Sequence, residues 1–170
     1  MGAVVEIVPY DPSWPQIYRD VEKSLHALLK DAVKSIDHVG STSVPGLASK
    51  PYIDVDVVLS DMANLHECRI LMEGFGYEPR GSRYGDGVWA FMIRDPLPGR
   101  RVYLCPSDSG THFKRMRFRD ILRANAGVAG KYGELKQNLA HIYREDGDGY
   151  TRAKADFIEN ALKNNYLKEF

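Results

Sequence analysis

Two aspartates, Asp54 and Asp56, stand one residue apart inside an otherwise apolar run, IDVDVVL. Aspartate is depleted in β-strands because its short side chain competes for backbone hydrogen bonds and packs poorly on a pleated face. In a strand, residues i and i+2 point to the same face about 6.5–7 Å apart. We therefore expect both carboxylates to project together, while Ile53, Val55 and Val57 face the core.

Two like charges at this range repel each other unless solvent or a cation lies between them. Mg²⁺, or Mn²⁺ in its place, suits the pair because such an ion takes carboxylate oxygens, keeps several waters and accepts substrate phosphates. A half-buried strand whose wet face carries two acids would show the same spacing. The spacing alone favours neither interpretation.

The segment GSTS comes just before this strand and adds a second feature. Gly40 allows a tight turn after a predicted strand, and Ser41, Thr42 and Ser43 offer backbone N–H groups and hydroxyls for a phosphate cradle. A plain strand-to-helix turn with a serine cap would contain the same residues, and no Walker A motif occurs in the chain. Lys50 follows at the start of the acidic strand, where its charge would neutralise phosphate.

The segment HFKRMRFRDILR predicts a basic helix. Arg115, Arg119 and Arg123 fall at i, i+4 and i+8 and so share one face. A guanidinium group suits the binding of a triphosphate, and such a ridge would complement the acids and their metal. A solvated helix face with Asp120 as a local partner explains each single arginine as well.

Three other patterns are more typical of structure than of chemistry. In YTRAKADFIENAL, one helical stripe contains Tyr150, Lys154, Phe157 and Ile158. Such a stripe is more typical of core packing around a lysine whose amine reaches solvent than of a ligand site. His38 and His112 are isolated in the sequence, which favours structural histidines. Cys68 and Cys105 lack CxxC spacing, so neither a zinc site nor a disulfide framework is indicated.

The elements that must position these residues follow from periodicity and turn signals. Asp11 is predicted to cap the first helix, with Pro12 at its first position, and Asp61 is predicted to cap another that ends near Gly74. The predicted strands are 4–10, VKSIDHVG closed by Gly40, 52–59, 88–94 and 101–105, and the predicted C-terminal helices are 112–125, 128–144 and 149–163. This order predicts an α/β (α+β) fold with a sheet of about five strands flanked by helices, followed by a helical C-terminal part.

Composition limits the classes of partner. A chain of 170 residues is long enough for one domain, 1–170, with its sheet core at about 4–110 and its helical part at about 111–165. The 23 basic and 23 acidic residues balance, so we expect no binding of nucleic acid or of a membrane surface through net charge. The N-terminal segment lacks a signal-peptide pattern and no apolar run reaches membrane-spanning length, which predicts a cytoplasmic protein. A protein partner is left open.

The GSTS turn followed by Asp54-Val55-Asp56-Val57 resembles the nucleotidyltransferase fold of the DNA polymerase beta type. More specifically, IVPYDPSWP, HVGSTSVPGLASKPYIDVDVV and FRDILRAN look like the GrpB family, also called UPF0157, over residues 5–162. The resemblance implies a nucleotidyltransferase-like mixed sheet. That family also occurs fused to dephospho-coenzyme A kinase, which suggests a nucleotide link.

The resemblance also implies a third carboxylate, which active nucleotidyltransferases usually supply from a later strand. The matching strand here is RRVYLCP, in which Arg101 and Tyr103 stand where an acid would help. Asp86 and Asp108 lie outside predicted strands and are the first replacements to consider. We therefore expect weak or absent nucleotidyl transfer.

Together these features predict a protein that binds a nucleoside triphosphate with Mg²⁺ or Mn²⁺. The predicted metal ligands and catalytic residues are Asp54 and Asp56, and the predicted phosphate-binding residues are Gly40, Ser41, Thr42, Ser43, Lys50, Arg115 and Arg119. If the protein is active, a nucleotidyl group would pass to an unknown acceptor. The alternative is a non-catalytic nucleotide- or partner-binding module, with a link to coenzyme A metabolism.

Overall fold

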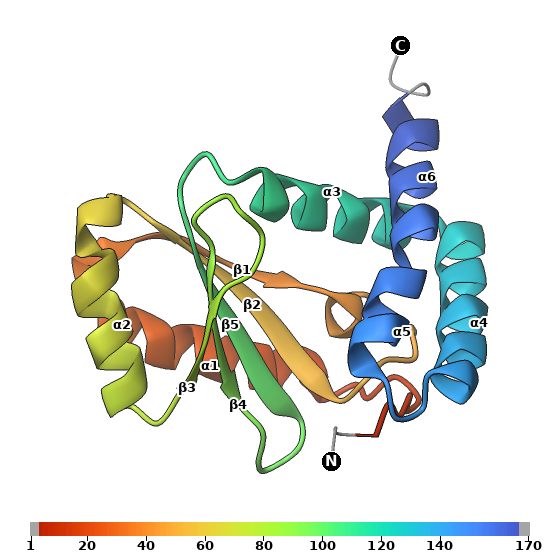
Figure 1. The fold of residues 1–170 in the computed structure, drawn as a ribbon, viewed down its shortest axis with the longest axis horizontal. Coiled ribbons are helices and arrows are strands. Elements are labelled where there is room, and N and C mark those ends of the chain that lie inside the picture. Colours follow the sequence, from red (N-terminus) through yellow and green to blue (C-terminus); the bar gives the residue numbers. More distant parts are fainter. Residues whose placement is uncertain (1–3, 167–170) are drawn as a thin grey trace.

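The computed structural model describes residues 4–166 and contains a five-stranded mixed sheet with helices on both faces (Figure 1). Strand β2 pairs in parallel with β5, and the other neighbours are antiparallel. In spatial order the strands are β1 (Val33–Val39), β2 (Tyr52–Leu59), β5 (Gly99–Cys105), β4 (Trp89–Ile93) and β3 (Glu78–Ser82). The predicted mixed α/β fold with about five strands is therefore confirmed.

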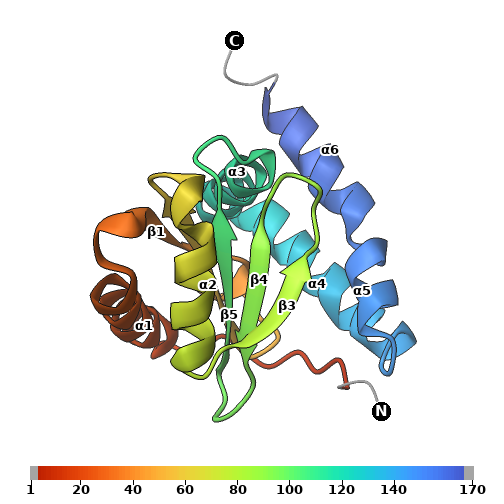
Figure 2. The same cartoon turned by 60° about the vertical axis from the view of Figure 1, so that its left-hand side comes forward.

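The helices form two layers around this sheet. Figure 2 shows the first two helices on one side of the strands and the remaining four on the other side. The C-terminal helical part predicted from the sequence is thus present, and it lies across the sheet face opposite the first helix. The helices are α1 (Trp14–Leu29), α2 (Leu65–Gly74), α3 (Gly110–Ala124), α4 (Ala126–Ile142), α5 (Gly147–Ala153) and α6 (Ala155–Tyr166).

The main hydrophobic core lies between the sheet and the layer of α1 and α2. Helix α1 presents an apolar stripe because its apolar residues recur at steps of three and four. Val21 and Leu25 from this stripe pack in one cluster with Ile53, Val55 and Val57 of β2. The alternate residues of β2 therefore turn toward the opposite face, where α3 lies.

The predicted first strand at residues 4–10 is wrong. The segment has a single isolated bridge, between Val8 and Ser49, and belongs to no strand of the sheet. Pro9 has no backbone N–H and so cannot extend a ladder beyond that bridge. The fifth strand is β3 instead, an edge strand whose pairing with β4 shifts between Pro79 and Gly81. Proline and glycine concealed its strand pattern in the sequence.

Some helix boundaries also differ from the prediction. Helix α1 begins at Trp14 rather than Pro12, because the Asp11 carboxylate accepts a hydrogen bond from the Ser13 N–H and closes a turn before the helix. Asp61 caps a short 3₁₀ segment that leads into α2. The predicted helix at 149–163 is interrupted at Lys154, which ends α5 before α6 begins.

Both cysteines, Cys68 and Cys105, are buried free thiols. Within residues 4–166, no helix is both long and apolar enough to cross a membrane.

Replacing Leu25 by alanine should lower the free energy of unfolding by about 2–5 kcal/mol, because the removed atoms leave a cavity between α1 and the sheet. Leu25 is fully buried, whereas Ile142 on α4 is 71% exposed. Urea denaturation of Leu25→Ala should therefore show a much earlier midpoint than that of the matched variant Ile142→Ala. Equal midpoints would contradict this description of the core.

Candidate functional site: an acidic strand crossed by a basic helix

Strand β2 turns both aspartates toward the face covered by α3. Asp56 is fully buried, while the Asp54 side chain is 20% exposed. On the neighbouring strand β5, Arg101 pairs with Asp54 in the register and Tyr103 pairs with Asp56. The two carboxylates therefore share one face, as predicted, but they lie in different surroundings.

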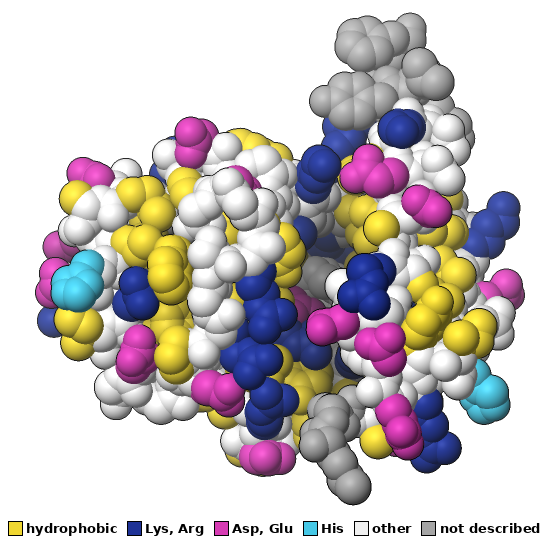
Figure 3. All heavy atoms as spheres, in the orientation of Figure 1, with side chains coloured by type: hydrophobic (Ala, Val, Ile, Leu, Met, Phe, Trp, Pro, Cys, Tyr) yellow, Lys and Arg dark blue, Asp and Glu magenta, His cyan; other side chains and the backbone are white. Residues whose placement is uncertain are grey.

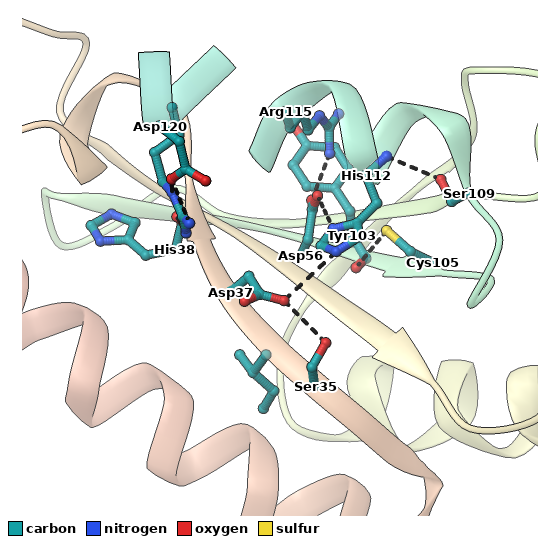
Figure 4. Close-up of polar contacts among 12 residues, drawn as sticks. Ser35, Asp37, His38, Asp56, Tyr103, Cys105, Ser109, His112, Arg115 and Asp120 are labelled. Carbon is teal, nitrogen blue, oxygen red and sulfur yellow. Dashed lines mark hydrogen bonds and ion pairs between the residues drawn. The ribbon is translucent and has the colours of Figure 1, made fainter. Parts of the chain in front are cut away.

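Helix α3 supplies two side chains, Arg115 and His112, that contact the Asp56 carboxylate. Arg115 Nη1 donates to Asp56 Oδ1 at 2.7 Å, and His112 Nδ1 lies 3.0 Å from Asp56 Oδ2 (Figure 4). The Arg115 guanidinium also stacks on the ring of Tyr103, 4.0 Å from its centroid. Both oxygens of Asp56 are therefore engaged by the protein itself, and His112 is not the isolated histidine that the sequence indicated.

A third carboxylate lies nearby, on β1 rather than on β5. Asp37 is directly opposite Asp56 in the antiparallel pair, so both side chains project from the same face. His112 Nε2 lies 3.7 Å from Asp37 Oδ2, and Ser35 donates to the same oxygen at 3.0 Å (Figure 4). The sequence search for a third acid missed Asp37, although the alternation of Ser35 and Asp37 along β1 was a usable signal.

The other acids considered as replacements are placed differently. Asp86 accepts hydrogen bonds from the Ser109 hydroxyl at 2.7 Å and from the Thr111 N–H at 3.0 Å, so it fixes the start of α3. Ser109 in turn caps that helix by accepting from the His112 N–H. Asp108 is exposed. Neither acid is hydrogen-bonded or ion-paired to a residue of the predicted pair in the structure.

The Gly40-Ser41 turn lies directly against Asp54. Gly40 has φ +72°, and a Cβ atom added to it would lie 2.6 Å from Asp54 Oδ2. Thr42 donates its hydroxyl to the Tyr52 carbonyl, and Ser43 donates its hydroxyl to the Gly40 carbonyl. Thr42 and Ser43 therefore stabilise the turn from inside, whereas Gly40 is exposed beside the acid.

The predicted arginine ridge of α3 binds the protein's own acceptors. Beyond Arg115, Arg119 donates to the His38 carbonyl at 3.1 Å and Arg123 donates to the Ser43 carbonyl at 2.9 Å. These bonds clamp α3 to the end of β1 and to the turn that follows it. The ridge therefore positions the site, and only Arg115 reaches the acidic pair.

A group of basic side chains surrounds Asp54, and we call Lys50, Arg101, Lys136 and Lys154 the basic cluster. Arg101 Nη1 lies 3.7 Å from Asp54 Oδ1, with its guanidinium stacked over Tyr52 at 4.0 Å. Figure 3 shows Lys and Arg side chains gathered along the hollow between the sheet and the C-terminal helices. The sequence identified Lys50 in this role. Lys154 was interpreted as part of a core-packing stripe and Lys136 was not singled out, because both come from segments distant from Lys50.

Burial and mutual repulsion lower the pKa values of the lysines in the basic cluster. Desolvation, followed by the Arg101 charge, lowers the pKa of Lys50 to about 8. Desolvation and the Lys50 charge lower the pKa of Lys154 to about 8, and desolvation with the Lys154 charge lowers that of Lys136 to about 7. Burial also raises the pKa of Asp54, although Arg101 and Arg115 oppose this. The charged groups around Asp54 are therefore partly removed from water, and the positive ones outnumber the negative ones.

The two aspartates differ in whether a divalent cation could reach their oxygens. No group of three or more His, Cys, Asp or Glu residues in the described part of the chain is arranged to hold a metal ion. A cation on Asp56 would have to displace Arg115 or His112 from its oxygens. Asp54 is more exposed and can add one carboxylate to a cation that also takes phosphate oxygens.

This site lies within the region matched by a known family. The family model described as GrpB protein matches residues 4–164. The chain belongs to the GrpB family. A UPF0157 protein of Halalkalibacterium halodurans is 30% identical over 162 residues, which is 95% of this chain and 83% of that protein. A dephospho-CoA kinase of Mycolicibacterium paratuberculosis is 34% identical across 95% of this chain, which spans 46% of the kinase.

Solved structures agree with the family and its fold. The crystal structure of the conserved protein GrpB from Enterococcus faecalis has a TM-score of 0.86 at 28% identity, covering 96% of this chain and 99% of that one. The Cid1 poly(U) polymerase with MgGTP bound has a TM-score of 0.54 at 13% identity, covering 79% of this chain and 44% of Cid1. The GrpB chain therefore has a nucleotidyltransferase-like fold.

The lowered pKa of Lys136 predicts a pH dependence of stability. Its folded pKa is about 7 and its ordinary value is 10.5, so between these values the unfolded chain binds a proton that the folded chain has released. The free energy of unfolding should therefore rise with pH from about 7 to about 8.5, below the ordinary range of the thiols. Lys136→Met should reduce this slope in urea denaturation, most clearly between pH 7 and 8, because Lys50 and Lys154 contribute a slope of the same sign above about pH 8. The exposed Lys131→Met on the same helix should keep the full slope. Equal slopes in the two variants would contradict the buried amine.

Proposed function

We propose that this GrpB protein binds a nucleoside triphosphate on the sheet face around Asp54, with phosphate groups between the Gly40-Ser41 turn and the basic cluster. The observation that carries this proposal is the excess of positive charge around a single partly exposed carboxylate. Lys50, Arg101 and Lys154 all interact electrostatically with Asp54 or with one another. A bound polyanion would relieve their repulsion and compensate their desolvation.

The geometry of the Gly40-Ser41 turn supports phosphate as the anion that binds here. Gly40 has the backbone conformation that favours glycine, and it lies so close to Asp54 that an added Cβ would meet the carboxylate. Turns of this kind present successive backbone N–H groups to phosphate oxygens. The fold adds weight as an analogy, because the Cid1 structure of similar fold is described with MgGTP bound. A cytoplasmic location suits such a ligand and stays a prediction.

We propose binding, rather than nucleotidyl transfer, as the principal activity. A two-metal transfer needs one cation to activate the attacking oxygen and another to stabilise the leaving pyrophosphate. Asp56 would have to contribute to both ions, yet Arg115 and His112 occupy its oxygens. We therefore expect release of pyrophosphate from ATP to stay near background, and robust turnover that is lost in Asp54→Asn would overturn this choice.

A second candidate function is supported by the dephospho-CoA kinase relative, of which this chain spans 46%. Under this alternative, the GrpB chain is a non-catalytic module that serves an enzyme of coenzyme A metabolism. Titration with dephospho-coenzyme A alongside ATP separates the two ideas. Binding of dephospho-coenzyme A without binding of ATP would favour the module.

A pair of glycine variants tests the placement of phosphate. Gly40 and Gly46 both have positive φ, at +72° and +81°, so alanine strains the backbone at either position. A Cβ atom on Gly40 would collide with Asp54, whereas one on Gly46 would meet open space. Calorimetric titration should show ATP affinity lowered about tenfold in Gly40→Ala and nearly unchanged in Gly46→Ala. Equal affinities in folded samples of both variants would show that the turn is only a connector.

Replacing Asp54 by asparagine tests the metal separately from the nucleotide. Without divalent cation, Asp54→Asn should bind ATP more tightly than the wild type, because a negative charge beside the phosphates is removed. With Mg²⁺ or Mn²⁺, the variant should bind more weakly, because a carboxylate ligand is lost. The exposed Asp108→Asn serves as the matched control and should change neither affinity. An Asp54→Asn variant that matches the wild type in both conditions would place the phosphates elsewhere.

A further inference from the structure

Two lysines that are far apart in the sequence contact the same aromatic ring. Lys50 Nζ lies 4.2 Å from the centroid of the Tyr150 ring, and Lys154 Nζ lies 4.5 Å from the same centroid. Lys50 precedes β2, whereas Lys154 lies in the break between α5 and α6. Tyr150 is only 1% exposed, so its ring is a fixed contact shared by the two ammonium groups.

A third lysine lies behind this pair. Lys136 of α4 is 2% exposed, donates to the Ala48 carbonyl, and has its Nζ 5.0 Å from the Tyr132 ring centroid. Burying an ammonium group is unfavourable unless it is paired and hydrogen-bonded. Within residues 4–166, the acids whose charges act on these three lysines are Asp54 and the exposed Asp148. The fold therefore concentrates positive charge here beyond what its own acids compensate.

We propose that Lys50 and Lys154, which both contact the Tyr150 ring, form with Lys136 the subsite for the terminal phosphates of the nucleoside triphosphate. This inference rests on the proposed function and deepens it by assigning the β- and γ-phosphates, rather than the nucleotide as a whole, to these lysines. Gly40 of the turn lies directly against the Asp54 carboxylate. Lys50, just before β2, and Lys154, between α5 and α6, both interact electrostatically with the same carboxylate. A phosphate chain that begins at the turn would extend toward the lysine pair.

Lys154 follows Tyr150 by four residues, the spacing at which side chains meet on one helical face. It lies between α5, which ends at Ala153, and α6, which begins at Ala155. Lys154 Nζ lies over the ring of Tyr150, four residues earlier, and Asp146 fixes that turn by accepting from the Gly149 N–H. The local geometry thus holds the amine over this ring before any ligand binds.

Calorimetric titration with ATP, AMP and inorganic tripolyphosphate, all without divalent cation, tests the subsite. The wild type should bind ATP about tenfold or more tightly than AMP, because AMP has no terminal phosphates. Lys154→Met should lower the affinity for ATP by about tenfold and leave that for AMP nearly unchanged, whereas Lys154→Arg should retain most of the ATP affinity. Lys163→Met, an exposed lysine of α6, is the matched control and should bind as the wild type does.

The outcomes separate this inference from the proposed function. Equal affinities for ATP and AMP in the wild type, or equal losses for both ligands in Lys154→Met, would overturn the subsite while leaving nucleotide binding intact. Tighter binding of tripolyphosphate than of ATP would assign the lysines to an inorganic polyphosphate and overturn the nucleotide as the ligand. Absence of binding by all three compounds would overturn both ideas. Thermal melting of each variant by circular dichroism excludes unfolding as the cause of any loss.

Discussion

The contact between Asp56 and the basic side chains of α3 is the interaction on which the rest of this molecule depends. It joins the centre of the sheet to the first helix of the C-terminal part through Arg115 and His112. Breaking such a buried pair by removing one partner typically costs about 3–5 kcal/mol, because the remaining charge is left without compensation. The position of α3, and with it the clamp on the turn by Arg119 and Arg123, follows from this contact.

The same face of β2 therefore has two parts with opposite electrostatic character. Around Asp56, carboxylates and cations from β1, β2 and α3 compensate one another in a buried network. Around Asp54, two residues earlier, the cations of the basic cluster outnumber the acids, and all of them except the buried Lys136 remain partly accessible. On this strand, Asp56 therefore stabilises the fold, whereas Asp54 lies beside a surface suited to an anion.

The sequence predicted the local features of this arrangement well. The alternation of acids and apolar residues in β2 indicated which side chains would face the core, and burial of Ile53, Val55 and Val57 confirms this. Pairing between distant elements could not be inferred in the same way. Asp37 joins the site through an antiparallel register, and Lys136 and Lys154 join it through helix packing, neither of which is encoded in residue spacing.

Lys50 and Lys154 have a practical consequence for studying this chain. An amine with a pKa of about 8 is neutral, and hence nucleophilic, far more often at neutral pH than an ordinary surface lysine. An acylating reagent should therefore modify these two side chains ahead of the exposed lysines of the chain. A ligand that covers them would protect both from acylation together, so peptide mass mapping of the acylated protein would report occupancy of the site.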